Sequence, residues 1–169
     1  MAKVKTAKRT LTAALLMGIV VVLVLILYWP NVRERRQAMF IDAAVSGNIG
    51  RMKLLLAFGA SPEEPACNTP QCPSPLIAAS IDGNSDAVQL LLDHGASVNG
   101  KMKRGQSALI AAAYEGHADV VRLLLSKGAD VNADWEGCTS LGVAKQKGHT
   151  EIADLLLKAG ATKGGNCDK

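Results

Sequence analysis

The sequence predicts an all-α repeat solenoid of about four helix-turn-helix units behind a single N-terminal transmembrane helix. Three features predict it: a glycine follows another glycine by twelve residues four times, leucines precede the second glycine of each pair, and one long run near the N-terminus is apolar and uncharged. Units repeated at a fixed spacing stack, each burying its apolar face against its neighbour. Such an array presents an extended surface, which favours binding over catalysis.

The chain begins with a basic tail, residues 1–10, followed by the apolar run from Leu11 to Trp29. At about 1.5 Å per residue, a helix of this length reaches roughly 28 Å, close to the hydrocarbon thickness of a bilayer. Tyr28 and Trp29 stand at its end, where aromatic rings favour the membrane interface. We therefore expect residues 11–29 to span the membrane.

A cleaved signal peptide is the alternative to this anchor. The apolar run is longer than the usual ~7–15 residues of a signal peptide, and no small-x-small cleavage site follows it. An uncleaved anchor is therefore favoured. The positive-inside rule places the N-terminus in the cytoplasm, because four Lys and Arg side chains precede the run and three follow it by residue 36.

The four repeat units begin at intervals of 36, 33 and 32 residues. Their glycine pairs are Gly47 and Gly59, Gly83 and Gly95, Gly116 and Gly128, and Gly148 and Gly160. The leucine blocks are residues 54–56, 90–92, 123–125 and 155–157. The second glycine of each pair falls where the end of a helix favours a left-handed residue.

Unit three shows the pattern of one unit most clearly. Residues 108–114 predict a short alanine-rich helix that a neighbouring helix can approach closely, and a turn follows at Gly116-His117. A second helix then carries valines and leucines on a broad apolar face. One such pair of helices is too small to hold a core alone, so its stability must come from stacking.

The residues that fill this frame resemble the ankyrin-repeat family, and the chain is similar to small membrane-anchored bacterial ankyrin proteins. Unit three reads GQSALIAAAYEGH and then VVRLLLSKGADVN, close to the family pattern GxTPLHxAAxxGH and VVxLLLxxGADVN. The resemblance covers residues 38–163, between a linker at 30–37 and a C-terminal tail at 164–169. The family's usual histidine after Thr-Pro-Leu is replaced by Ile77, Ile110 and Gly142, so its hydrogen-bonding role is lost.

All four cysteines follow the apolar run, and an even number in a small exported domain indicates two disulfides. Cys67 and Cys72 enclose a turn in the lengthened loop between units one and two. Cys138 lies in the hairpin before unit four, and Cys167 falls where a further hairpin would stack beside it, so we expect a second pair. Four reduced thiols are the alternative. The disulfides and the anchor together predict a single-pass inner-membrane protein with its repeats in the periplasm.

Composition and motifs argue against several other functions. The chain's net charge of +4 is accounted for by its first ten residues, so a basic face for nucleic acid is not expected. Cys67 and Cys72 lack a second pair of ligands for zinc, and no phosphate-binding glycine loop is present. We expect no enzyme activity, no cofactor, no metal and no small-molecule substrate.

The resemblance implies that a protein partner binds the concave face, which hairpin tips and first helices form. Carried onto this chain, that face comprises Ile81, Asp82, Lys103, Arg104, Gln106, Tyr114, Glu115, Trp135, Glu136, Gln146 and Lys147. Trp135 and Tyr114 are the candidate anchors, because aromatic side chains dominate binding hot spots. Sideways packing on the adjacent hairpin is the alternative for Trp135.

The expected function is protein–protein interaction in the cell envelope, as a periplasmic adaptor. Small envelope-located proteins that resemble this chain also suggest two alternatives: an immunity protein that blocks a toxic enzyme, or a stress-defence accessory associated with catalase. A weaker alternative is a structural role, in which Ala14 and Gly18 form a small-residue face for association of membrane helices.

Overall fold

The computed structural model describes residues 32–67, 69, 71–102, 105–162, 164 and 167. Residues 36–169 form one compact unit, which is described here by itself. The basic tail at 1–10 and the expected membrane segment at 11–29 lie outside the described residues. Within the described ranges, no helix combines the length and the apolar character needed to cross a bilayer.

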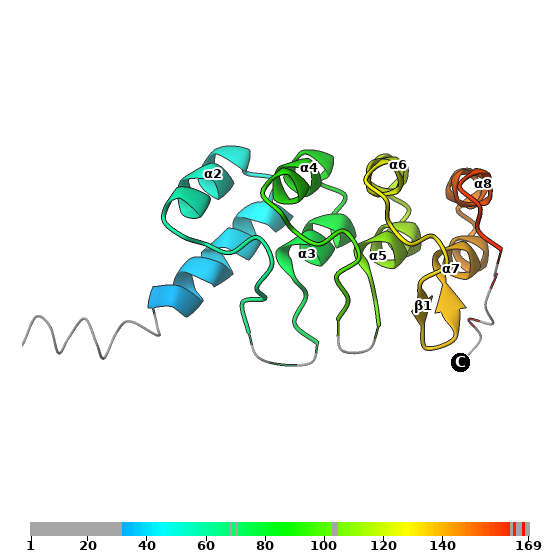
Figure 1. The fold of residues 1–169 in the computed structure, drawn as a ribbon, viewed down its shortest axis with the longest axis horizontal. Helices are drawn as coiled ribbons and strands as arrows, with labels where there is room; N and C mark the ends of the chain where they lie inside the picture. The colour runs from blue at the N-terminus through cyan, green and yellow to red at the C-terminus, as the bar shows by residue number, and fades with distance from the viewer. Residues whose placement is uncertain are drawn as a thin grey trace, which may run out of the picture. The chain divides into compact units, whose positions relative to one another are not determined.

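The described chain forms four pairs of antiparallel helices, as the glycine spacing predicts (Figure 1). Residues 32–45 are helical and pair with α2 (Ile49–Ala57). The next pairs are α3 (Pro75–Ile81) with α4 (Ser85–Asp93), α5 (Ala108–Glu115) with α6 (Ala118–Ser126), and α7 (Ser140–Lys147) with α8 (Thr150–Lys158). A two-stranded hairpin precedes α7, formed by β1 (Asp134–Trp135) and β2 (Cys138–Thr139).

The described residues are helical from residue 32 onward, so part of the range 30–37 that the sequence assigns to a linker belongs to a helix. Gln37 explains why this part of the chain belongs to the array. Its buried side-chain amide donates to the carbonyl of Ser61 at 2.8 Å and accepts from the amide of Ser61 at 3.0 Å. The helix is therefore tied to the loop that follows α2.

The helices lie in two layers (Figure 1). Helices α3, α5 and α7 stack side by side in one layer, and α4, α6 and α8 stack in the other. Small residues fill the first layer, where Ala79, Ala112 and Ala144 are completely buried. Leu91 and Leu124 fill the space between the layers and are equally inaccessible. Small side chains permit close approach of the helices, and the burial of the larger leucines removes apolar area from water, which stabilises the stack.

Each first helix of units two to four begins at a hydroxyl side chain. Ser74, Ser107 and Thr139 each accept a hydrogen bond from the backbone amide three residues later. Such caps satisfy an amide that the helix itself leaves unpaired. Helices α5 and α7 both end at a glycine in the left-handed conformation.

In units three and four, a histidine in the turn between the two helices joins the unit to the one before it. His117 Nε2 lies 2.8 Å from the carbonyl oxygen of Ile81, and His149 Nε2 lies 3.2 Å from that of Tyr114. A Cβ atom on Gly83 would come within 2.5 Å of the His117 ring. The glycine is therefore required by both its positive φ and the imidazole that covers it.

Both expected disulfides are present. The Cα atoms are 5.8 Å apart in Cys67–Cys72 and 4.9 Å apart in Cys138–Cys167. Both values lie within the range of about 4.4–6.8 Å that a disulfide requires. The predicted pairing of all four cysteines is confirmed, and no cysteine is free.

Candidate protein-binding surface

Three loops project on the same side of the array, beneath the layer of first helices (Figure 1). In the last of these loops, Trp135 pairs with Cys138 in the β1–β2 hairpin. Glu136 and Gly137 connect the strands with φ values of 52° and 88°. Two successive residues with positive φ are typical of a type I′ turn, whose twist matches that of the flanking strands. The hairpin therefore holds Trp135 on a defined edge beside α7.

A hollow of about 430 Å³ lies between this hairpin and the ends of α5 and α7. It is lined by Tyr114, Trp135, Glu136, Cys138, Val143, Gln146, Lys147 and Cys167. Five of these residues belong to the partner-binding set that the sequence predicts. The structure thus brings the expected anchors, Trp135 and Tyr114, to one concave place.

Trp135 is half-buried rather than fully exposed at the hairpin tip. One side of it packs against an apolar cluster that contains Ile110, Ala133, Cys138 and Val143. Its indole Nε1 is buried and has no hydrogen-bond partner among the described residues. Trp135 therefore combines the two sequence interpretations, because it packs sideways on the hairpin cluster and also lines the hollow. This packing fixes the side chain in advance, which lowers the entropy lost when a partner binds.

Tyr114 and Lys147 meet at the rim of the hollow. The Lys147 Nζ atom lies 3.9 Å from the centre of the Tyr114 ring, in a cation–π contact. Tyr114 keeps 36% of its surface exposed, and Lys147 is exposed as well. A partner group at this rim would therefore meet an aromatic face and a positive charge together.

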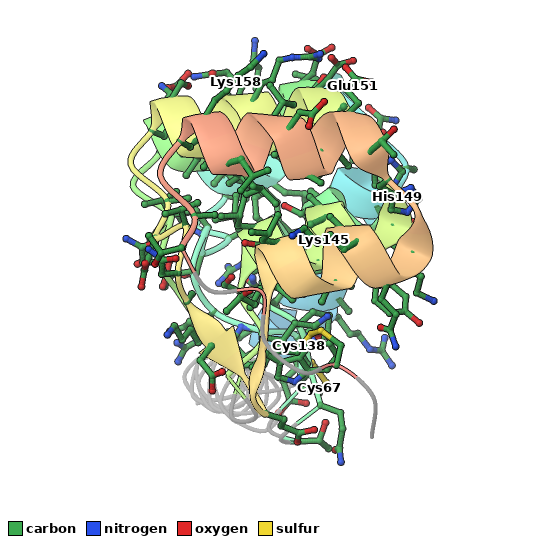
Figure 2. The ribbon with its side chains drawn as sticks, turned by 90° about the vertical axis from the view of Figure 1, so that its right-hand side faces the viewer. Cys67, Cys138, Lys145, His149, Glu151 and Lys158 are labelled. Carbon is green, nitrogen blue, oxygen red and sulfur yellow. A yellow bond between two sulfur atoms is a disulfide. The ribbon has the colours of Figure 1, made fainter. Side chains whose placement is uncertain are left out.

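Figure 2 views the array from its C-terminal end. Lys145 lies on α7, His149 lies in the turn to α8, and Cys138 lies on the hairpin side of α7. Gln146, on the same helix, donates from its side-chain amide to the backbone carbonyl of Cys167 at 3.3 Å. This contact holds Cys167 at the wall of the hollow.

The remaining predicted residues that the structure describes do not line this hollow. Ile81 is half-buried against the main core, and its carbonyl pairs with His117. Asp82 and Glu115 are exposed at the ends of α3 and α5, and Gln106 is half-buried with its backbone carbonyl bonded to the amide of Met102 at 3.0 Å. Lys103 and Arg104 lie outside the described residues.

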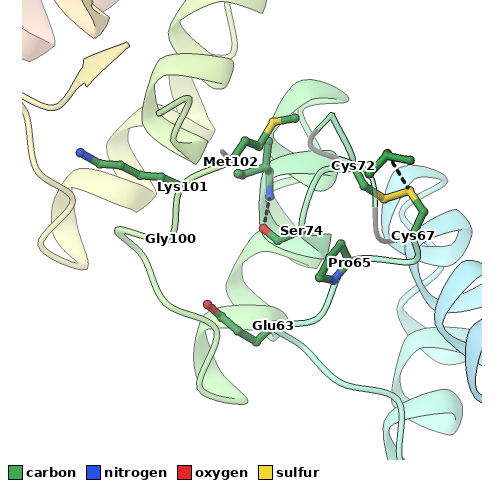
Figure 3. Close-up of a pocket in the computed structure, with 10 residues that line it drawn as sticks. Glu63, Pro65, Cys67, Cys72, Ser74, Gly100, Lys101 and Met102 are labelled. Carbon is green, nitrogen blue, oxygen red and sulfur yellow. Dashed lines mark hydrogen bonds between the residues drawn. A yellow bond between two sulfur atoms is a disulfide. The ribbon is translucent and has the colours of Figure 1, made fainter. Parts of the chain in front are cut away.

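A second hollow, of about 330 Å³, lies between the loop that holds the Cys67–Cys72 disulfide and the loop that joins α4 to α5 (Figure 3). Its lining includes Glu63, Cys67, Ser74, Lys101 and Met102. The partner-binding set predicted from the sequence contains none of these residues. The sequence feature that could have pointed to this hollow is the lengthened loop that holds Cys67 and Cys72.

Among the described residues, no group of three His, Cys, Asp or Glu side chains is placed to hold a metal ion. One carboxyl has a shifted pKa: the side-chain amide of Gln89 and the ammonium of Lys127 lower the pKa of Asp93. Both donate to Asp93 Oδ1, at 2.6 and 3.2 Å. Asp93 is exposed on the surface and belongs to neither hollow.

Comparison with known proteins agrees with the repeat architecture. A family model described as ankyrin repeats (3 copies) matches residues 40–134 and 76–167. The two matches together include every helix from α2 to α8. A search of curated proteins finds no match.

Proposed function

Because the chain belongs to the ankyrin-repeat family, whose arrays are protein-interaction modules, we propose that it is a membrane-anchored adaptor that binds a protein partner. The partner binds at the hollow bordered by Tyr114, Trp135 and Lys147. The observation that carries this proposal is the meeting of two aromatic side chains from different units at one concave place. Aromatic anchors in pockets supply most of the affinity of typical interfaces.

The chemistry of the hollow fits a protein segment. Trp135 and the Cys138–Cys167 disulfide form an apolar wall, while Lys147, Glu136 and Gln146 surround it with polar groups. An apolar centre with a polar rim is the usual anatomy of protein interfaces. The rim carries both charge signs, so charge here sets orientation and encounter rate more than affinity.

The proposed location is the periplasm, with residues 11–29 as an inner-membrane anchor and the N-terminus in the cytoplasm. Support comes from the length and apolar character of the run, from the basic tail before it, and from two disulfides, which persist in oxidising compartments. Intact spheroplasts should expose the repeats to added protease, whereas protection of the repeats until the membrane is broken would contradict this orientation. Recovery of uncleaved protein in the soluble fraction would contradict the anchor.

Site-specific photo-crosslinking tests the proposed binding surface. A photoreactive residue at Glu136, on the exposed turn of the hairpin, should crosslink to a discrete protein in intact envelopes. The matched control is Leu157 on α8, which is 48% exposed on the other layer. Equal crosslinking from both positions, or none from Glu136, would exclude the hollow as the contact surface.

A further inference from the structure

Gly164 and Cys167 occupy a place on α7 that Gly142 leaves open. A Cβ atom built on Gly142 would collide with the backbone carbonyl of Gly164 and come within 2.8 Å of Cys167 Sγ. In the two preceding units the equivalent positions hold Ile77 and Ile110, whose side chains are buried. Unit four thus gives up a core side chain at this position, and the space is taken by Gly164 and Cys167, which we call the strap.

The strap also forms part of the candidate binding surface. Cys167 lines the hollow, and it packs with Trp135 against the cluster of Ile110, Ala133, Cys138 and Val143. Gln146, another lining residue, donates to the backbone carbonyl of Cys167. Cys167 therefore shares its apolar surroundings with Trp135 and a hydrogen bond with Gln146.

The disulfide to Cys138 fixes the strap in this position. Cys167 is half-buried, and the hydrogen bond that it accepts from Gln146 is exposed to solvent, where water competes with it. By contrast, Cys67 and Cys72 are only five residues apart, and their disulfide closes a local turn. The Cys138–Cys167 bond joins positions 29 residues apart, across the whole of unit four.

We propose that the Cys138–Cys167 disulfide is a redox switch for partner binding: the oxidised strap completes the hollow, and reduction releases the strap and opens the wall. The proposal rests on the function proposed above. In the reaction, a thiolate of a dithiol reductant attacks the disulfide, and its second thiol resolves the mixed disulfide. The S–S bond between Cys138 and Cys167 breaks, both become thiols, and the reductant becomes a disulfide.

Trp135 reports the state of the strap without any partner. Trp29→Phe leaves Trp135 as the only tryptophan of the full chain, and Cys67→Ser with Cys72→Ser leaves Cys138–Cys167 as the only disulfide. In this background, a dithiol reductant should shift the tryptophan emission to longer wavelength and increase its quenching by acrylamide. Adding Cys138→Ser and Cys167→Ser should give the reduced-state values with no response to reductant. Unchanged emission and quenching upon reduction would overturn the proposal.

Gly142→Ala tests separately whether the strap needs the open position beside Gly142. Its added methyl group occupies the place of Gly164 and Cys167, which disfavours the Cys138–Cys167 disulfide. More free thiol should therefore be labelled at a fixed ratio of reduced to oxidised glutathione. Gly50→Ala is the matched control, because a Cβ there meets its nearest neighbour, Asn48 Oδ1, at an ordinary 3.7 Å. Circular dichroism should show the same helix content for both variants. Equal thiol labelling of the two variants would contradict the proposed position of the strap beside Gly142.

The affinity for the partner that photo-crosslinking captures distinguishes a failure of the redox switch from a failure of the proposed function. Reduction should weaken binding in the protein that lacks Cys67–Cys72, and Trp135→Ala should weaken it in both redox states. If reduction has no effect while Trp135→Ala abolishes binding, the switch is wrong and the binding surface stands. If neither change affects binding, the binding surface is wrong, and the fluorescence experiment alone then decides whether reduction releases the strap.

Discussion

His117 shows how one side chain connects two repeats. Its ring covers Gly83 of the preceding unit, and its Nε2 pairs with the carbonyl of Ile81 at the end of α3. The last carbonyls of a helix have no partner within the helix, so this contact satisfies one of them. His149 does the same for Tyr114 in the next unit. The turn that the sequence predicts at Gly116-His117 is therefore confirmed, and Gly148-His149 forms the equivalent turn in unit four.

We expect His117→Ala to lower the free energy of unfolding by about 1–2 kcal/mol, because a partly buried carbonyl loses its hydrogen bond. Urea unfolding followed by circular dichroism measures the change. His94→Ala is the control: its ring is exposed and pairs only with Leu90 of its own helix, so the loss should be smaller. Equal losses in the two variants would show that the contact between repeats contributes little.

Asp93 carries the pH dependence that the structure predicts at the residue scale. Gln89 first and Lys127 second lower its pKa in the folded protein, so its contribution to stability is present above the ordinary carboxyl pKa of about 3.9. That contribution is lost as the pH falls through the lowered folded value. Gln89→Ala should move the pKa of Asp93 back towards its ordinary value, as measured by NMR titration. Lys158→Ala, far along the chain on α8, should leave it unchanged; an unshifted pKa in Gln89→Ala would contradict the assigned cause.

At the scale of elements, the β1–β2 hairpin depends on its turn. Gly137 has a φ of 88°, in the left-handed region where side chains with a Cβ are disfavoured. We expect Gly137→Ala to lower the free energy of unfolding by about 1–2 kcal/mol. Gly50→Ala, within α2, should instead raise it by about 0.5–1 kcal/mol. A neutral result for Gly137→Ala in urea unfolding would mean that the turn relaxes at little cost.

Sequence periodicity predicted the helix pairs because leucines and glycines recur at the spacing that stacking requires. The resemblance to ankyrin repeats, rather than periodicity, placed Tyr114, Trp135, Glu136, Gln146 and Lys147 on one surface, since the family frame assigns hairpin tips and first helices to the same side. The frame could not predict how deeply Trp135 is buried, because Cys167, which packs against the same apolar cluster, lies beyond the last repeat. The frame also missed that residues 32–37 are helical, because the contacts of Gln37 are with a loop and leave no periodic signal.

At the scale of the whole molecule, the two ends of the array of repeats differ. Near the N-terminal end, Leu54 and Phe58 of the α2 segment are exposed by 57% and 67%. At the C-terminal end, the disulfide-linked strap covers part of α7. Terminal units of an array lack a neighbour on one side. Here the Cys138–Cys167 disulfide holds the strap against the C-terminal unit. The candidate binding surface lies at this covalently fixed end, where Trp135 is held before a partner arrives.

Partner affinity measured for matched variants tests the central claim most directly. Full-length protein in detergent should bind the crosslinked partner, and Trp135→Ala should weaken binding by about 2 kcal/mol or more, as expected for a hot-spot residue. Phe58→Ala, an exposed aromatic at the other end of the array, should bind like the unaltered protein. If Trp135→Ala and Tyr114→Ala both remain folded and bind with unchanged affinity, the hollow is not the binding surface and the account is contradicted.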